Sequence, residues 1–574
     1  MMFLNEPSVV RDLIEKRGSL YAARPDWYIR NFNGNMNIAF RDNDDIWRRM
    51  RKMYHVRLNF SVSNTYIPYQ TLDSLQLLND MIDTPEKFSS HLQRYTTSIA
   101  STVLYGWRTP NVDAGYVKDL ISWMDRTSEV ANLQLVDFYH FLRPLYHRMP
   151  DWMSTYKRKL AFLRNLENRL FLSLLDDAKA KLNSGRVYPS FIRDMLLSKD
   201  SDRLSELEIA HQAAHGFGAG SDTQWNTLLG FIKAMILYPE TQAAAHEELD
   251  RVIGSDRLPT WEDRPQLPYI RAVVEESLRW MPTTLSAAVP HSNSRDDDYK
   301  GYHIPKGSTM MLNVWTLNNS LPIAKGNPRV FDPTRHSASA TSNEQYGIDA
   351  DSNKRAHFTF GAGRRVCPGY HVAERGLFIA ISRLLWAFKF ERTYDELGNM
   401  IPIEQDATTP GLIVRPIECT ISPRDEKRTA LIRTEWKNAQ AMLDSEGNYS
   451  EEQFAKIFER SRNNFGAEYA LKLDAFKFPE KTPRVAAAYF GEGVASEGDL
   501  HGALDFAARG CPVMFICHNN GFAILNPAPE QYRSDRIASR DQGYCIDILR
   551  VNGTDIFVGY AATKEARRRA LLHG

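Results

Sequence analysis

Apolar residues recur at three- and four-residue intervals over most of the first 280 residues of the chain. The spacing is clear in 9–14, 72–81 and 160–175, and it predicts helices that bury one face. A longer helix is predicted over 205–237, ending before Pro239, and a helix that contains 273–280 ends before Pro282. This half of the chain is therefore predicted to be mainly α-helical.

The pattern changes after residue 284. Turn signals at 296–298 and 305–307 separate short β-prone runs such as 309–314. A loop at 361–369 is predicted to open another helix, and 402–422 favours a β-hairpin that turns at Pro410-Gly411. The fold class expected for this part is mainly α with small β-sheets.

A second change follows the charged, helical stretch 425–465. Residues 485–490 and 513–517 are predicted to be strands, and 498–508 is predicted to be the helix between them. This order is typical of a βαβ unit with a parallel sheet. We therefore expect a first domain at 1–443, a linker at 444–465 and a partial α/β domain at 466–574.

Composition narrows the class of protein without naming a function. The chain has 574 residues, enough for more than one domain, and its 71 Lys+Arg against 70 Asp+Glu do not indicate a nucleic-acid partner. Five scattered cysteines without a C-x-x-C pair are typical of a reducing compartment. The first residues show neither a signal peptide nor a membrane anchor, so a soluble or peripheral chain is expected.

Residues 360–369 have the pattern F-x-x-G-x-R-x-C-x-G. Glycines such as Gly363 let the backbone turn tightly and approach a flat ligand, and a cysteine presented by such a loop suits a thiolate bound to a haem iron. A buried structural cysteine is the alternative, although Phe360, Gly363, Arg365 and Cys367 together disfavour it. Cys367 is therefore the candidate metal ligand.

The 205–237 helix carries Ala-Gly-Ser-Asp-Thr at 219–223, after glycines at 216 and 218. Glycine is unfavourable inside a helix, so the cluster indicates a kink or close packing. The acid Asp222 and the hydroxyl of Thr223 could deliver protons there by general acid catalysis. Ordinary packing glycines are the alternative interpretation.

Glu276 and Arg279 are three residues apart and share one face of a helix. Exposed, the pair would contribute little to stability, but its apolar neighbours predict burial. A buried pair needs further partners, and Arg335 could supply one. We expect these three residues to hold the loop that carries Cys367.

Trp47 and Arg51 lie one helical turn apart, and both donate hydrogen bonds that suit a haem propionate. A solvated basic helix is the alternative, and it is preferred for Arg48, Arg49 and Lys52. His291 is a candidate for the second propionate, or a histidine in a surface turn.

These motifs, in this order, resemble the cytochrome P-450 family of haem-thiolate monooxygenases, in particular the fungal microsomal type, over about 7–443. The resemblance implies haem b with Cys367 as its proximal ligand, Asp222 and Thr223 in oxygen activation, and Glu276, Arg279 and Arg335 as a structural triad. It also implies insertion of one oxygen atom of O₂ into a small apolar substrate near Phe217, Ala219 and 283–289. The family takes electrons from NADPH through a reductase and is expected at the endoplasmic reticulum membrane.

Two departures from that family are visible. The chain starts at a point where the family has already passed its membrane anchor, first helix and first strands, so the substrate channel and sheet edge are expected to be incomplete. Asn318-Asn319 replaces a usual His-Arg, and the family's PERF-like arginine lies in Pro-Thr-Arg.

Residues 484–570 carry a second set of motifs. Gly-Glu-Gly at 491–493 and Asn-Asn at 519–520 each follow a predicted strand, and Glu492 and Asn520 offer oxygen ligands that suit Mg²⁺ beside a diphosphate. Plain turns are the default interpretation. The wider context resembles the alpha subunit of branched-chain 2-oxo acid dehydrogenase, a mitochondrial family that implies thiamine diphosphate, Mg²⁺ and a beta subunit.

His518 replaces an arginine that this family uses to grip the diphosphate, and the upstream strands and the histidine-bearing loop of its site are missing. Three interpretations follow. The first is a haem monooxygenase, the second a thiamine-dependent 2-oxo acid dehydrogenase component, and the third an inactive fusion of two gene fragments. The incomplete thiamine site favours the first.

Overall fold

The structure is a computed structural model. It describes residues 1–31, 35–111, 113, 115–130, 134–184, 188–197, 204–285, 287–336, 355–406, 414, 417–450, 452–453, 456–457, 486–491, 513–518, 522–523 and 526–527. The chain divides into two compact units, Met1–Tyr469 and Ala470–Gly574. Each unit is described by itself.

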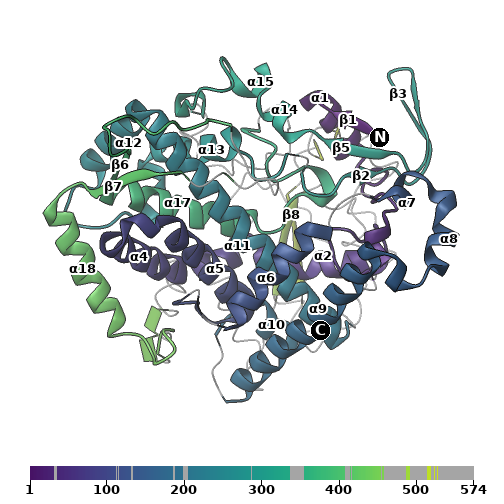
Figure 1. Ribbon diagram of the computed structural model, residues 1–574, viewed down its shortest axis with the longest axis horizontal. Helices are drawn as coiled ribbons and strands as arrows, with labels where there is room; N and C mark the ends of the chain where they lie inside the picture. Colours follow the sequence, from purple (N-terminus) through teal and green to yellow (C-terminus); the bar gives the residue numbers. More distant parts are fainter. Residues whose placement is uncertain are drawn as a thin grey trace. The chain divides into compact units, whose positions relative to one another are not determined.

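The first unit is built mainly from α-helices (Figure 1). Its longer helices match the apolar periodicity of the sequence, so the mainly helical prediction is confirmed. These are α2 (Asp45–Leu58), α4 (Ile67–Asp83), α5 (Phe88–Tyr105), α6 (Gly115–Val130), α9 (Thr155–Asn183), α11 (Glu206–Leu237), α12 (Pro239–Val252), α13 (Pro268–Trp280), α17 (Tyr370–Ala387) and α18 (Glu426–Gln440). The shorter ones are α1 (Pro7–Val10), α3 (Phe60–Ser63), α7 (Leu135–Phe138), α8 (Arg143–Arg148), α10 (Phe191–Leu197), α14 (Val314–Asn318) and α15 (Leu321–Ala324).

Helix α11 begins and ends where the sequence predicts. The Ser205 hydroxyl accepts a hydrogen bond from the Glu208 N–H, and the Glu208 carboxylate accepts one from the Ser205 N–H, which forms a capping box. The helix ends at Leu237, before Pro239. Residues on all sides of it are buried, because α5 packs along it and α9, α13 and α17 contact it.

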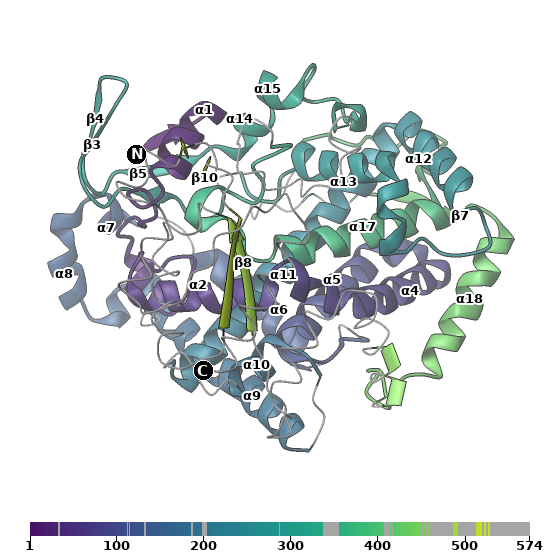
Figure 2. The same ribbon diagram turned by 180° about the vertical axis from the view of Figure 1, so that it is seen from behind.

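Helices α4, α5, α11 and α17 lie together in the middle of this unit in both views (Figures 1 and 2). Their facing side chains form the main core, which includes Ile99, Leu228, Phe231, Phe378 and Leu384. Burial of such side chains is worth about 1.5–3 kcal/mol each against leaving them exposed, and it provides a rigid frame for α11.

Small sheets lie beside the helices. Strand β5 (Thr309–Leu312) pairs in parallel with β1 (Met2–Leu4) and antiparallel with β2 (His291–Ser292), so Met310 lies opposite both Met2 and His291. Strands β3 (Asp297–Tyr299) and β4 (Tyr302–Ile304) form a hairpin. The β-prone run at 309–314 is thus confirmed as a strand that becomes α14.

The β-hairpin predicted over 402–422 is wrong in its described part. Strand β7 (Cys419–Pro423) pairs antiparallel with β6 (Phe388–Arg392), and residues 401–406 form no strand. Phe388 and Phe390 of β6 are buried, so one face of β6 packs on the core. Strand β7 pairs with β6 and completes a two-stranded sheet. Pro410 and Gly411 lie outside the described residues.

In the second unit, β8 (Ala486–Gly491) and β9 (Val513–His518) pair in parallel, with Ala486 opposite Val513. Both predicted strands and their parallel pairing are confirmed. Short strands β10 (Phe522–Ala523) and β11 (Asn526–Pro527) pair antiparallel. The helix predicted at 498–508 lies outside the described residues.

Candidate functional site

The cysteine loop has a backbone that only glycine permits. Gly361 and Gly363 adopt φ angles of +74° and +62°, and a Cβ on Gly363 would collide with the carbonyl oxygen of Ile14. After the turn Gly363–Arg365, the Cys367 N–H donates to the Phe360 carbonyl at 2.9 Å, and α17 begins at Tyr370. The loop therefore fixes Cys367 directly before a core helix.

The thiol of Cys367 is half-buried and has no disulfide partner among the described residues. Burial raises its pKa, while the Gly369 N–H and the charge of Arg51 act in the opposite direction. Arg51 donates to the carbonyl of Val366, the residue before Cys367. A cation and an amide donor beside a desolvated sulfur suit a thiolate that binds a metal.

Arg365 lies against Trp47, one of the predicted propionate ligands. Its guanidinium lies 3.9 Å from the ring centre of Trp47, and it donates to the carbonyls of Ala22 and Arg41 at 2.8 and 2.9 Å. Arg24, which no motif in the sequence marks, donates to the carbonyls of Val289 and Pro290 at 2.7 and 2.9 Å. Arginines from distant segments thus gather near the cysteine loop.

The charges of these arginines are poorly balanced. Burial lowers the pKa of Arg24 to about 9 and that of Arg365 to about 8, and repulsion among Arg24, Arg51 and Arg365 adds to the effect. Asp42 offsets part of this charge, but it is shared with Arg30 at 3.7 Å. Because such a cluster favours anions, the two carboxylates of a haem fit the residues present.

His291 is buried, with 3 % of its surface exposed, so the surface-turn interpretation is wrong. Its Nδ1 pairs with the carbonyl oxygen of Tyr21 at 2.9 Å. Burial and then the charge of Arg24 lower its pKa to about 3, so the ring is neutral. A role at the propionates stays a prediction. Arg48 and Lys52 are exposed, as the solvated-helix interpretation expects.

The glycines of α11 allow close packing, and the helix continues through them. A Cβ on Gly216 would lie 3.1 Å from Leu104, and one on Gly218 would lie 3.0 Å from the Trp123 ring and 3.1 Å from the Met124 sulfur. The glycines therefore let α5 and α6 approach α11 where Asp222 and Thr223 follow.

Asp222 and Thr223 differ in their environments. Burial raises the pKa of Asp222 to about 6, and the nearby carboxylate of Asp125 contributes. The Thr223 hydroxyl donates to the Ala219 carbonyl at 2.7 Å. Ala219 and Thr223 are exposed although most of α11 is buried. An acid that titrates near neutral pH thus sits beside an accessible hydroxyl.

Glu276 and Arg279 are fully buried and form a two-pronged ion pair at 2.7 and 2.8 Å. Arg335 adds a contact of 3.3 Å to the same carboxylate, so the structure brings the predicted triad together. His336, which sequence reasoning missed, lies 2.9 Å from Glu276. Burial alone would raise the pKa of Glu276, but hydrogen bonds from Arg279 and His336 hold it at about 2.

Asn318, one of the two departures from the family pattern, links this cluster to the cysteine loop. Its carbonyl accepts from Arg279 at 3.2 Å. Its side chain accepts from the Phe358 N–H at 2.8 Å and donates to the Thr359 hydroxyl at 3.2 Å. Both residues directly precede Phe360, so the cluster and the loop share one hydrogen-bond network.

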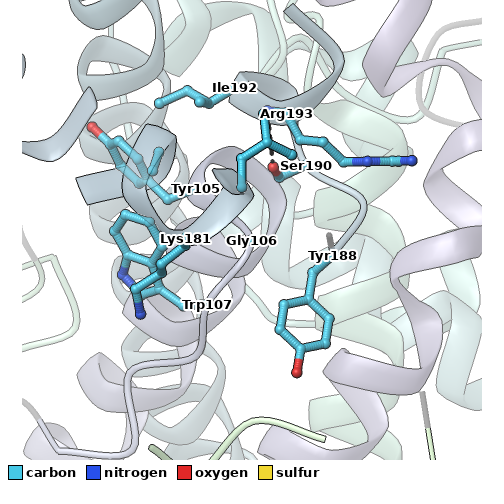
Figure 3. Close-up of a pocket in the computed structure, with 10 residues that line it drawn as sticks. Tyr105, Gly106, Trp107, Lys181, Tyr188, Ser190, Ile192 and Arg193 are labelled. Atoms are coloured by element: carbon cyan, nitrogen blue, oxygen red, sulfur yellow. Dashed lines mark hydrogen bonds between the residues drawn. The ribbon is translucent and has the colours of Figure 1, made fainter. Parts of the chain in front are cut away.

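A separate pocket lies where α5 and α9 end and α10 begins (Figure 3). The Lys181 ammonium lies 4.9 Å from the ring centre of Trp107 and pairs with Glu446 at 2.7 Å. Figure 3 shows Arg193 and Tyr188 pointing away from Lys181 and Trp107. None of the predicted site residues lines the pocket, so it is distinct from the cysteine site.

The predicted Mg²⁺ ligands Glu492 and Asn520 lie outside the described residues. Within the residues that the structure describes, no cluster of three His, Cys, Asp or Glu side chains is placed to hold a metal ion. No helix in that part of the chain is both long and apolar enough to cross a membrane.

Comparison with known proteins gives two family matches. The model of the family described as Cytochrome P450 matches residues 1–416, and that of the Dehydrogenase E1 component matches residues 436–573. The cytochrome P450 monooxygenase virE of Hypocrea virens is 38 % identical over 451 residues, which are 77 % of this chain and 81 % of the relative. The cytochrome P450 monooxygenase fogE of Aspergillus ruber is 36 % identical over 456 residues, 78 % and 83 % of the two chains.

Solved structures agree on the fold. A zebra fish cytochrome P450 solved with abiraterone superposes with a TM-score of 0.56 at 22 % identity, covering 74 % of this chain and 93 % of that one. The progesterone-bound structure gives 0.57 at 24 % identity with the same coverage. The mainly helical fold with small sheets is thereby confirmed for the first unit.

Proposed function

The chain belongs to the cytochrome P450 family, and from this premise we propose that it is a haem-thiolate monooxygenase that inserts one oxygen atom of O₂ into a small apolar substrate. The observation that carries the proposal is Cys367 in its glycine-dependent loop, directly before α17 and beside Arg51. A structural cysteine needs neither the glycine-dependent loop nor the cation.

We assign the roles around the cofactor as follows. Cys367 would hold the haem iron, and Trp47, Arg51, Arg365 and His291 would hold its two carboxylates. A haem with a thiolate ligand supplies the activation of dioxygen. The Glu276 network keeps the loop in place through Asn318 and Thr359.

Asp222 and Thr223 manage protons in this proposal. With a pKa of about 6, the Asp222 carboxyl exchanges protons readily near neutral pH. The Thr223 hydroxyl now donates to the Ala219 carbonyl, and rotation about χ1 turns it toward the accessible side of α11. Asp222 then replenishes the proton that Thr223 delivers.

The stoichiometry requires an external electron source. One oxygen atom enters a C–H bond of the substrate, and the other leaves as water after taking up two electrons and two protons. We assign the electrons to NADPH through a separate reductase, as the family pattern implies, and the protons to the Asp222 route. On the same family pattern we assign the enzyme to the endoplasmic reticulum membrane.

The decisive experiment is the carbon monoxide difference spectrum of the reduced, haem-loaded full chain. We expect the red-shifted Soret band of a thiolate-ligated haem, and we expect Cys367→Ala to abolish it. Cys419→Ala is the matched control, because Cys419 is also a half-buried free cysteine of the same unit and should keep the band. A band that survives Cys367→Ala would contradict the proposal.

The match to the Dehydrogenase E1 component raises a second candidate function, thiamine-dependent decarboxylation. We infer that this activity is absent, because His518 stands where the resembled family uses an arginine to bind the diphosphate. Calorimetric titration of the full chain with thiamine diphosphate and Mg²⁺ should give no heat of binding. Saturable binding that is lost in Glu492→Ala would reverse this inference.

A further inference from the structure

Two histidines lie one turn apart on α11, just before its glycine-rich stretch. His211 and His215 are 0 % and 8 % exposed, and their ring centres are 5.5 Å apart. The Nε2 of His211 pairs with the Asn168 side chain at 3.2 Å, whereas its Nδ1 has no hydrogen-bond partner among the described residues. Neither ring nitrogen of His215 has a hydrogen-bond partner among the described residues.

The surroundings of His215 are aromatic. Its ring centre lies 5.7 Å from that of Trp123 on α6 and 5.8 Å from that of Phe171 on α9. Burial lowers its pKa well below 6.5, and His211 contributes, so the imidazole is neutral at physiological pH. A neutral ring offers one N–H donor and one acceptor. Leaving both unused in the interior is costly, and such groups are rare in folded proteins.

His215 also lies on the side of α11 that carries the proposed chemistry. It precedes Ala219 by four residues and Asp222 by seven, so the three share one face of the helix. On this helix Ala219 and Thr223 are exposed, while His215 closes the next turn against α6 and α9. His215 and Thr223 are therefore about two turns, or roughly 11 Å, apart along this helix.

We propose that His215 hydrogen-bonds a neutral hydroxyl or carbonyl group of the substrate. This inference rests on the proposed function and deepens it, because it names the substrate class as a ring-bearing apolar molecule with an oxygen substituent. Trp123 and Phe171 provide the apolar walls, and the neutral imidazole provides the polar contact. A carboxylate is excluded because the desolvated ring carries no charge to balance it.

The test compares two probes that share one ring skeleton, 1-tetralone and the hydrocarbon tetralin. Their dissociation constants are measured from the Soret shift of the haem-loaded full chain. One buried hydrogen bond should make tetralone bind about tenfold more tightly than tetralin. His215→Phe keeps a ring of similar size and should bring the ratio to about one, while His215→Gln, which keeps a donor and an acceptor, should retain part of the preference.

His211→Phe is the matched control and should keep the wild-type ratio, because His211 is turned to Asn168. A ratio that is the same in the wild type and in His215→Phe overturns the inference, and so does a wild type that shows no Soret shift with tetralone. His215→Leu replaces the phenylalanine variant if the latter loses its carbon monoxide band. Absence of that band in the wild type would instead overturn the proposed function, so the two failures are distinguishable.

Discussion

Glu276 and Asp222 are carboxylates on contacting core helices, α13 and α11, and their surroundings shift their pKa values in opposite directions. Glu276 is surrounded by Arg279, Arg335 and His336, and its pKa is held at about 2. Asp222 is half-buried, and its pKa rises to about 6 because burial is reinforced by a second carboxylate, Asp125.

The difference separates a stabilising site from a reactive one. A carboxylate that gains partners on folding stabilises the protein, whereas one that loses water without gaining partners destabilises it. Perturbed groups of the second kind concentrate where chemistry needs a proton near neutral pH. His215, two turns from Asp222 on the same helix, has no hydrogen-bond partner at either ring nitrogen among the described residues. Asp222 and His215 on α11 therefore lower the stability of the first unit, and the Glu276 network on α13 raises it.

The largest expected effect is that of Glu276→Ala. The substitution leaves two buried arginines without their counter-ion and a buried histidine without its hydrogen-bond partner, so the free energy of unfolding of the first unit should fall by about 3–5 kcal/mol. Urea titration followed by tryptophan fluorescence measures this loss. Glu276→Gln, which keeps the shape and some hydrogen bonds, should fall between the wild type and the alanine variant. A loss below about 1 kcal/mol in Glu276→Ala would show that the network does not support the fold.

Acid should weaken the same network. The folded pKa of Glu276, about 2, lies below its ordinary value of 4.5, so its contribution is fully present above about pH 4.5 and is lost as pH falls toward 2. The amount is roughly 3 kcal/mol from the size of the shift. Unfolding free energies measured across this window in the wild type and in Glu276→Gln should converge at the acid end. Parallel curves would contradict the assignment.

The sequence predicts the residues that lie close together along the chain, but not the partners that tertiary packing brings to them. The Glu276–Arg279 pair follows from helical spacing, Asp222 and Thr223 follow from the glycine cluster that precedes them, and the cysteine loop follows from its own motif. His336 and Asn318 reach Glu276 and Arg279 through tertiary packing across long stretches of chain. The sequence marks Asn318 only as a departure from the family pattern, and it does not mark His336 at all. Arg24 was missed for the same reason. The hairpin at 402–422 failed because the partner of β7 is β6, a strand that precedes the predicted turn.

Asp222→Asn should act in the opposite direction to Glu276→Gln. Removing a carboxylate whose folded pKa is raised should stabilise the first unit at pH 7 by about 1–2 kcal/mol, a value discounted for its partial exposure. The gain should be complete above about pH 6 and disappear as pH falls to 3.8, where Asp222 is protonated in both states. Thermal unfolding across this range measures it, and product formation should fall because the proton donor is lost. If Asp222→Asn is less stable at pH 7 than the wild type, the Asp222 carboxylate stabilises the fold and the contrast with Glu276 is wrong.

The smallest effect tests whether burial, rather than spacing, gives the Glu276 pair its strength. Asp45 and Arg48 form an ion pair with the same three-residue spacing on α2, at 2.6 Å, but their side chains are 90 % and 58 % exposed. Water and salt screen such a pair, so Arg48→Ala should change the free energy of unfolding by no more than about 0.5 kcal/mol. Urea titrations at low and high salt measure the change. A loss comparable to that of Glu276→Ala would mean that spacing alone sets the energy of these pairs, and the contrast between the two carboxylates would need another cause.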